Sequence, residues 1–552
     1  MSNADAIPAL LIALPILAAA LPLGLGLLRE RIGWSIAAVT LAVETVLAGL
    51  VAVAVIGNGT VRHQLGGFVP PRGIELVVDL YSLLVISLIA AFSLAVLVFS
   101  RRAGPRGNAF YSAYLLLVGG LMGVALTGDL FNMFVFLEIT GIATYALVAS
   151  SRRADAAIAS LKYLLIGTVG ASLFLIGVGY LYVATGTLNM VDLSQALAGQ
   201  TEVVQNAEMY EGYDELYSYP LVLASFGFIA VGLLTKAAIY PLHTWQPDAY
   251  ATAPHSVTAL ISALVSTVGA YALGRVMFTV YTVDFFEAVP EAALFIAVIG
   301  SVSILAGSVL AVIQRDVKRM LAYSSVAQFG LIVAAFGLAA YAPSIGAETA
   351  ARYALLGALV HLVGHGVMKG GAFLAVGGVA LSTGARTVSE YANLARRRPF
   401  FAGSIAILGI GLVGVPPTVG FVGKWFVAVG AVQSELWPVV AVIILSTLLT
   451  LAYVARLLET MYFDHPGGEP HAHEGGVAAG SGEHAATDGG TESASQATTG
   501  GVVGSRVTIA ATLLVVALAL VTIALGFAGG AFDAVLEPII DQFLAGPQEV
   551  TQ

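Results

Sequence analysis

Long apolar runs recur along almost the whole chain, and they constrain its fold more than any other feature of the sequence. Many exceed the roughly 20 residues that an α-helix needs to cross a bilayer. Only 10% of the residues are charged, whereas a soluble domain carries about 25%. The sequence therefore predicts an all-α, polytopic membrane protein with about 14 transmembrane helices. The expected spans are 7–28, 34–57, 75–100, 109–127, 129–150, 161–184, 219–241, 254–281, 289–313, 318–340, 352–381, 403–431, 437–463 and 505–530.

Arginine and lysine are distributed unevenly between the predicted loops. Odd-numbered loops carry 14 of these residues and even-numbered loops carry 3. Loops rich in basic residues stay in the cytoplasm. This bias therefore supports the number of spans and places both termini on the outer side of the plasma (cell) membrane. Two segments are expected outside the bilayer: an acidic outer loop at 185–218 and a disordered, acidic cytoplasmic linker at 464–503.

The linker contains four histidines, which raise the question of a metal site. They are His465, His471, His473 and His484. Solvated low-complexity sequence is the favoured interpretation, because nothing nearby fixes a ligand geometry.

The absence of cysteine excludes disulfides, iron–sulfur clusters and thiolate metal sites. Any redox chemistry linked to this protein must therefore lie on another subunit, and no cofactor is expected in this chain. The net charge of −9 gives no support for nucleic-acid binding. No nucleotide-binding loop or nucleophile constellation stands out, so no enzyme active site is expected.

Glu138 is a carboxylate inside a predicted span, with no charged neighbour within one helical turn. Carboxylates within membrane spans are costly and are usually functional. One interpretation is a neutral acid that is hydrogen-bonded in the core. The favoured interpretation is a proton carrier, or the partner of a cation on another helix.

Two lysines lie in spans that proline interrupts. Lys236 precedes Pro241, and Lys424 follows Pro416 and Pro417. A broken helix leaves backbone groups free to line a polar cavity. Interrupted spans in matching positions of two halves point to inverted repeats with a functional site near the midplane. Lys236 is interpreted as a proton switch that releases its proton when a partner carboxylate moves away, and snorkelling to the surface is the alternative.

His361, His365 and Lys369 recur at intervals of four residues, which places them on one face of a helix. Histidine titrates near neutral pH and can pass protons. Zinc binding and satisfied core histidines are the alternatives. Lys162, at the start of a span, and Asp316, in a charged turn, could belong to a proton uptake route or serve as interfacial anchors.

Together these segments resemble the antiporter-like membrane subunits shared by respiratory complex I and the Mrp-type cation/proton antiporters. The resemblance covers roughly residues 75–463. Its most specific motifs are KAAIYPLHTWQPDA at 236–249, DVKRMLAYSSVAQ at 316–328 and GVPPTVGFVGK at 414–424. A further stretch, GDLFNMFVFLE at 128–138, looks most like the D-type subunit of the Mrp antiporters.

The resemblance implies two inverted five-helix repeats, each with one broken helix. It matches Glu138 to the family's acidic residue on span five, Lys236 to its partner on span seven and Lys424 to the terminal lysine on span twelve. Protons would pass between a cytoplasmic entry and an outer exit, and the Glu138–Lys236 pair would gate transfer to the central and distal lysine. The connecting cluster on span eleven corresponds to His361, His365 and Lys369.

The implied organisation has five parts. They are an N-terminal three-helix segment (1–108), a first antiporter-like repeat (109–281), a second repeat (289–463), the linker (464–503) and a C-terminal transmembrane helix with its tail (504–552).

One position departs from the family pattern. The family usually has a lysine on span eight, where this chain has Thr267. Threonine cannot hold an excess proton, although it can order water. The link between Lys236 and the span-eleven cluster would then run through water, run through His255, or be absent.

Three functions fit these residues. The first is the D-like, proton-conducting subunit of a multisubunit sodium/proton antiporter, with other membrane subunits, protons, sodium ions and the lipid bilayer as partners. The second is a proton-pumping membrane subunit of a complex I-like NADH/quinone oxidoreductase or a membrane-bound hydrogenase. The third is a membrane scaffold that no longer conducts. The motif at 128–138 favours the first.

Overall fold

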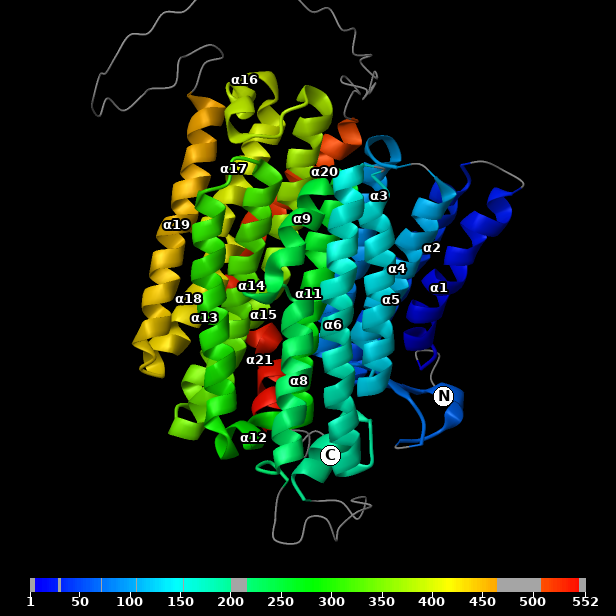
Figure 1. Cartoon of the computed structure of the whole chain (residues 1–552), viewed down its shortest axis with the longest axis vertical. Coiled ribbons are helices and arrows are strands. Elements are labelled where there is room, and N and C mark those ends of the chain that lie inside the picture. Colours follow the sequence, from blue (N-terminus) through cyan, green and yellow to red (C-terminus); the bar gives the residue numbers. More distant parts are fainter. Residues whose placement is uncertain are drawn as a thin grey trace, which may run out of the picture.

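The computed structural model describes residues 5–27, 31–70, 72–105, 107–151, 153–199, 216–463 and 508–545. Within these residues, twelve helices are long and apolar enough to span a membrane, and they stand side by side in a bundle (Figure 1). The predicted all-α, polytopic membrane fold is thereby confirmed. The linker at 464–503, its four histidines and the acidic residues between 202 and 215 lie outside the described residues.

The helices follow one another in four groups along the chain. The N-terminal group is α1 (Ile7–Gly26), α2 (Gly33–Asn58) and α3 (Leu80–Ala103). The next is α4 (Asn108–Leu126), α5 (Leu130–Ala149), α6 (Ala154–Thr185), α7 (Met190–Leu197), α8 (Pro220–Lys236), α9 (Trp245–Thr252), α10 (His255–Leu260), α11 (Ser266–Arg275) and α12 (Thr282–Ala288). The third is α13 (Pro290–Val312), α14 (Val317–Tyr341), α15 (Glu348–Thr383), α16 (Leu394–Arg397), α17 (Pro399–Val413), α18 (Val419–Gln433) and α19 (Trp437–Tyr462). The last is α20 (Ile509–Phe527) and α21 (Gly529–Ala545). Short 3₁₀ or π segments are η1 (Leu65–Gly67), η3 (Leu242–Thr244), η4 (Ile261–Val265), η5 (Val276–Tyr281), η6 (Ala342–Ile345) and η7 (Val388–Tyr391).

Two spans are broken near proline, one between α8 and α9 and one between α17 and α18. The prediction of 219–241 contained α8 but not α9, which continues this span after the break. The first helix ends at Lys236 and the chain turns at Pro241, while the second break contains Pro416 and Pro417. Proline has no N–H for the helical ladder, and its ring clashes with the preceding turn. If each broken pair is counted as one span, the two pairs together with the twelve long helices give the fourteen predicted spans.

The same local structure recurs in both halves of the central bundle. Asp129 caps the N-terminus of α5 and forms an isolated antiparallel bridge with Asn189. Asp316 caps α14 and pairs with Thr387 in the same way. Asn189 shares a pocket with η5, just before α12, whereas Thr387 lies just before α16, at the other end (Figure 1). Two inverted repeats would produce this arrangement.

Some elements were not predicted. Strands β1 (Val61–Gln64) and β2 (Glu75–Val78) form an antiparallel hairpin between α2 and α3, and α7 lies within the predicted outer loop. The helix α6 begins at Ala154 rather than at 161. The additional helix α21 buries side chains at three- and four-residue intervals, a signal that a search for long apolar runs overlooks. They are Leu536, Ile539, Ile540 and Phe543.

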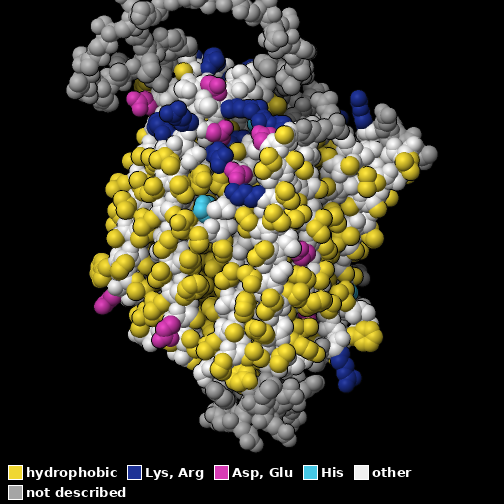
Figure 2. Space-filling view, viewed as in Figure 1, with side chains coloured by type: hydrophobic (Ala, Val, Ile, Leu, Met, Phe, Trp, Pro, Cys, Tyr) yellow, Lys and Arg dark blue, Asp and Glu magenta, His cyan; other side chains and the backbone are white. Residues whose placement is uncertain are grey.

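Figure 2 shows hydrophobic side chains over the flank of the bundle and lysine and arginine gathered toward one end. An apolar flank is what contact with lipid requires. The arginine-rich end, as we call it, is defined by Arg153, Arg319, Arg386, Arg396 and Arg397. The opposite end carries the β-hairpin, α7 and α12.

Candidate functional site

Glu138 and Lys236, which lie 98 residues apart in the sequence, meet inside the bundle. The Lys236 Nζ atom lies 3.3 Å from Oε1 of Glu138 and donates to the Leu137 carbonyl at 3.4 Å. The lysine side chain is 6% exposed and the glutamate side chain 25% exposed. The structure therefore brings together the acid and the cation that the sequence matched as partners.

The break after α8 positions the Lys236 ammonium against α5. On α11, a Cβ on Gly269 would lie 3.0 Å from the backbone of Lys236 and Ala237, so a larger residue there would push this backbone away from α11. A Cβ on Gly141 would lie 3.3 Å from the lysine Nζ and 2.9 Å from the Tyr145 hydroxyl oxygen. The ammonium and this hydroxyl therefore converge on space that a side chain at 141 would fill. Tyr145 was not singled out from the sequence.

The three α15 residues predicted to share a face are all fully buried. The Nε2 atom of His361 lies 2.8 Å from Gln328 Oε1 on α14, and the Lys369 Nζ donates to the Leu321 carbonyl at 2.8 Å. Within the described part of the chain, neither ring nitrogen of His365 has a hydrogen-bond partner. Gln328, which sequence reasoning missed, lies at the end of the second family motif.

Lys424 is held by the second helix break. Its Nζ donates to the carbonyls of Leu412 and Val413, at 2.9 and 3.0 Å. These carbonyls lie in the last turn of α17, where no further helical N–H is available to bond them. The break between α17 and α18 thus supplies free backbone carbonyls, as the proline pair predicted. The neighbouring Gly423 packs against His361: a Cβ there would lie 2.8 Å from its Nδ1 atom.

A neutral polar cluster lies near Thr267, where the family has its lysine. The Gln246 side-chain nitrogen donates to the Tyr250 hydroxyl at 3.0 Å and to the Ser266 hydroxyl at 3.2 Å, and all three side chains are buried. The Thr267 Oγ1 and Gln246 Oε1 atoms have no hydrogen-bond partner among the described residues. The ring of Tyr250 packs edge-on against Phe373 of α15. The cluster therefore lies between the Lys236 break and α15.

His255 does not lie beside this cluster. It precedes Thr267 by twelve residues on a continuous helical segment, which separates the two by about 18 Å along the axis. It instead lines a cavity of about 320 Å³ near the arginine-rich end, together with Asp316 and Lys318. The Lys318 Nζ donates to the Ala253 carbonyl at 2.8 Å. The structure therefore assigns His255 and Asp316 to one cavity and Thr267 to another region.

Lys162 is joined to this end of the bundle through a residue that sequence reasoning missed. The two carboxylate oxygens of Asp248 on α9 bind Lys162 of α6 at 2.8 Å and Arg319 of α14 at 2.9 Å. Asp248 therefore bridges the two halves of the bundle. Its place in the first motif, twelve residues after Lys236, was the available signal.

Glu44 is a second carboxylate in an apolar run, and sequence reasoning overlooked it. It lies in α2, is fully buried, and neither of its oxygens has a hydrogen-bond partner among the described residues. The criterion that selected Glu138, a lone carboxylate within a span, would also have selected Glu44.

Comparison with known proteins gives a consistent result. Residues 127–450 match the family described as NADH:quinone oxidoreductase/Mrp antiporter, TM. The chain is 40% identical over 412 residues to NADH-quinone oxidoreductase subunit N of Desulforudis audaxviator, covering 73% of this chain and 75% of that protein. It is 31% identical over 421 residues to the D-type subunit of the Na(+)/H(+) antiporter of Bacillus subtilis, covering 75% and 79%. A chain of the Mrp complex from a Dietzia species has the same fold, with a TM-score of 0.81, 24% identity, and coverage of 99% of this chain and 98% of that chain.

Proposed function

Because this chain belongs to the family of NADH:quinone oxidoreductase and Mrp antiporter membrane subunits, we propose that it conducts protons as the D-like subunit of a multisubunit Na⁺/H⁺ antiporter. The buried contact between Glu138 and Lys236 carries this proposal. The motif at 128–138, which ends at Glu138, favours the antiporter. In this proposal, the arginine-rich end faces the cytoplasm of the cell. The two repeats comprise residues 109–281 and 289–463. The assembly exchanges sodium ions for protons.

Proton uptake begins at the arginine-rich end. The cavity lined by His255, Asp316 and Lys318 admits water from that side. The Asp248 bridge, through its contacts with Lys162 and Arg319, adds a carboxylate close to this cavity. Both features supply polar groups at the point where a proton has to leave bulk water.

Glu138 and Lys236 form the first proton-holding pair. At 3.3 Å, a full charge pair is stabilised by about 5 kcal/mol for an effective dielectric constant of about 20. When the carboxylate turns away, the desolvated ammonium loses this stabilisation and passes on its proton. The carboxylate thus controls when Lys236 discharges.

Onward transfer crosses the neutral cluster before it reaches α15. Thr267 and Gln246 each have a buried oxygen free to bind water, and a water molecule can carry a proton where the side chains cannot. The proton then passes to Lys369 and His365, to His361, and finally to Lys424.

A specific observation favours a second candidate, a proton-pumping subunit of a complex I-like or hydrogenase-type redox assembly. The identity to subunit N of the NADH-quinone oxidoreductase, 40%, exceeds the 31% identity to the D-type antiporter subunit. The proton route within this chain would be the same. The two candidates differ in the neighbouring subunits and in the source of energy.

The deciding experiment measures sodium-induced pH changes in everted vesicles from an antiporter-deficient host that expresses the whole operon. We expect sodium to collapse the pH gradient in the wild type and in Glu459→Gln, a matched control at an exposed position of α19. Glu138→Gln and Lys236→Met should abolish the response. A wild type that ignores sodium, but acidifies vesicles when an electron donor is supplied, would replace the antiporter with the redox assembly.

A further inference from the structure

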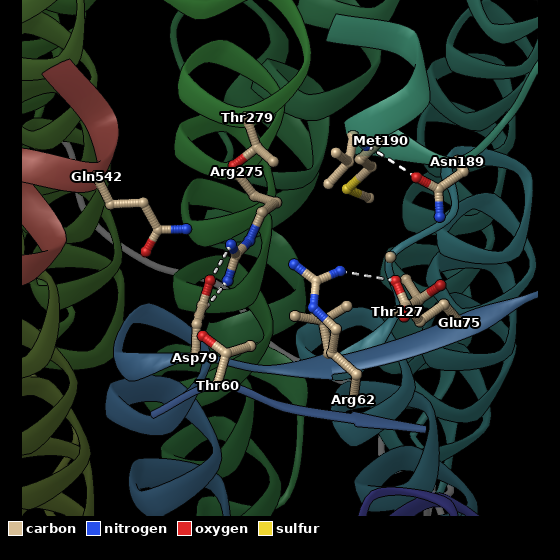
Figure 3. Close-up of a pocket in the computed structure, with 13 residues that line it drawn as sticks. Thr60, Arg62, Glu75, Asp79, Thr127, Asn189, Met190, Arg275, Thr279 and Gln542 are labelled. Atoms are coloured by element: carbon tan, nitrogen blue, oxygen red, sulfur yellow. Dashed lines mark hydrogen bonds and ion pairs between the residues drawn. The ribbon is translucent and has the colours of Figure 1, made fainter. Parts of the chain in front are cut away.

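A small cavity of about 60 Å³, whose lining includes four charged side chains, lies at the opposite end of the bundle, away from the proton route described above. This cavity is enclosed by the β-hairpin, the segment between α4 and α5, the start of α7 and the end of α11. Figure 3 shows two guanidinium groups in this cavity, Arg275 directed at Asp79 and Arg62 directed at Glu75. The Arg62 side chain is 46% exposed, so its pair lies at the mouth of the cavity.

The deeper pair, Arg275 and Asp79, is bidentate and almost completely buried. Two guanidinium nitrogens bind the two carboxylate oxygens, with Nη2 lying 2.7 Å from Oδ1, and the side chains are 7% and 3% exposed. Asp79 also caps α3, accepting from the Ser82 backbone N–H at 2.8 Å. Burial by itself would raise the pKa of the Asp79 carboxyl, but the charge of Arg275 and hydrogen bonds from Arg275 and Ser82 lower this pKa to about 2. The pair is therefore fully charged and rigidly held.

A line of polar side chains connects this pair with the region of Lys236. Thr267, Tyr271 and Arg275 are spaced four residues apart on α11 and share one helical face. The Arg275 Nη2 donates to the Tyr271 hydroxyl at 2.9 Å, and this hydroxyl donates to the Ala125 carbonyl at 2.9 Å. Thr267 is two residues from Gly269, whose helix packs on the Lys236 backbone. The line spans about 12 Å from Thr267 to Arg275.

Such a line of polar side chains is a possible leak route in a protein that must deliver its protons to α15 and Lys424. Water along it would let a proton on Lys236 escape directly to the opposite side, without reaching α15 or Lys424. A fixed guanidinium at the end of the line opposes this, because a positive charge in a narrow polar passage repels protons. Its partner carboxylate keeps it in place, since separating a buried ion pair costs several kcal/mol.

We propose that Arg275, held by Asp79, seals the end of this line and prevents protons from leaking out of the chain beside Lys236. The inference rests on the proposed function, because a seal is needed only if Lys236 carries protons. Arg275 acts as a positioning and blocking residue and takes no proton itself. The Arg62–Glu75 pair at the mouth adds a second, more exposed positive charge.

The test measures passive proton leak in proteoliposomes that contain the complete assembly, without sodium gradient or electron donor. We expect Arg275→Gln and Asp79→Asn to speed the decay of an imposed pH gradient by at least about tenfold. Arg275→Gln removes the repelling charge, and Asp79→Asn removes the carboxylate that holds this charge in place. Arg275→Lys keeps the charge without the bidentate hold and should leak less than Arg275→Gln. Glu138→Gln added to Arg275→Gln should suppress the leak, which would show that it passes through the Glu138–Lys236 pair.

The absence of cysteine in the chain allows a second readout that does not depend on transport. Thr279→Cys, in the cavity lining, should react with a membrane-impermeant thiol reagent from the cavity side in both wild-type and Arg275→Gln backgrounds. Thr267→Cys should react from that side only when Arg275 is replaced. Reaction at Thr279→Cys shows that the reagent reaches the cavity, and a single symmetric elution peak of the assembled complex in detergent shows that the variant is folded.

A folded Arg275→Gln variant with unchanged leak and a shielded Thr267→Cys would overturn the seal. The outcome is separable from the function assignment. If the wild type shows no sodium response but Arg275→Gln leaks, the seal stands and the antiporter proposal fails. If sodium exchange is intact and Arg275→Gln shows no increase in proton leak, only the proposal that Arg275 acts as a seal is wrong.

Discussion

The Nε2 atom of His361 on α15 lies 2.8 Å from the Oε1 atom of Gln328 on α14, and both residues are almost fully buried. An amide oxygen can only accept a hydrogen bond, so Nε2 carries the ring proton. The other ring nitrogen, Nδ1, has no hydrogen-bond partner in the described part of the chain and can accept a proton. It faces Gly423, next to Lys424. In the proposed proton route, this single hydrogen bond would orient the histidine toward Lys424.

Replacing Gln328 with leucine should therefore slow proton transport while leaving the fold intact. The expected loss is roughly tenfold, which corresponds to one hydrogen bond of about 1.4 kcal/mol. Initial rates in vesicles, normalised to the amount of assembled complex, give the measurement. Gln433→Leu, at an exposed position of α18, is the matched control. Equal rates in the two variants would show that the orientation of His361 does not limit transport.

Substitutions of Lys424 should separate its structural role from its proton-carrying role. Lys424→Met leaves the Leu412 and Val413 carbonyls without their donor, and we expect it to destabilise the protein by about 1–3 kcal/mol and to abolish transport. Lys424→Gln retains a donor and should recover much of the stability, but none of the transport. Thermal unfolding in detergent and vesicle assays report the two quantities. Transport by Lys424→Gln would argue against a charged carrier at this position.

Asp248→Asn should weaken proton uptake by an effect that depends on salt. The substitution leaves Lys162 and Arg319 facing each other without their shared carboxylate, and these side chains are partly exposed. Loss of stability should stay below about 1 kcal/mol for each pair. The transport rate should fall more at about 0.01 M salt than at about 1 M, because the screening length shortens from roughly 30 Å to roughly 3 Å.

A charge at the other end of the bundle provides the control for Asp248. Glu537→Gln removes one exposed partner of Arg352 and should leave uptake unchanged at both salt concentrations. A salt-independent loss of transport in Asp248→Asn would mean that Asp248 acts through position rather than through charge.

Glu44→Leu should stabilise the protein. The carboxyl is buried in α2 with no hydrogen-bond partner in the described residues, and an unpaired buried polar group costs about 1–3 kcal/mol. Leucine of similar size removes this cost, whereas Glu44→Gln keeps a buried polar group and should change little. Unfolding temperatures of the two variants in detergent provide the comparison. A lower unfolding temperature for Glu44→Leu, or a loss of transport, would reveal a role that the geometry does not show.

Much of the fold and part of the candidate site could be predicted from the sequence. The spans, the two breaks and the choice of Glu138, Lys236 and Lys424 as candidate residues follow from costs that are local to a few residues. A charge within an apolar run is expensive wherever the run packs, and a proline removes a backbone donor in any helix. The spacing of His361, His365 and Lys369 likewise fixes their common face without reference to other helices.

The remaining groups were decided by the tertiary structure. Gln328 and Asp248 lie inside two of the sequence motifs, but only helix packing creates the contacts that distinguish them from their neighbours. Asp79 and Arg275 lie 196 residues apart, and only the folded bundle brings them into one ion pair. The sequence by itself determined which charges must be buried, because burial cost depends on local hydrophobicity. Only the packing of the helices decided which partner each buried charge or polar group receives, because hydrogen bonds and ion pairs require atoms within about 3 Å of one another.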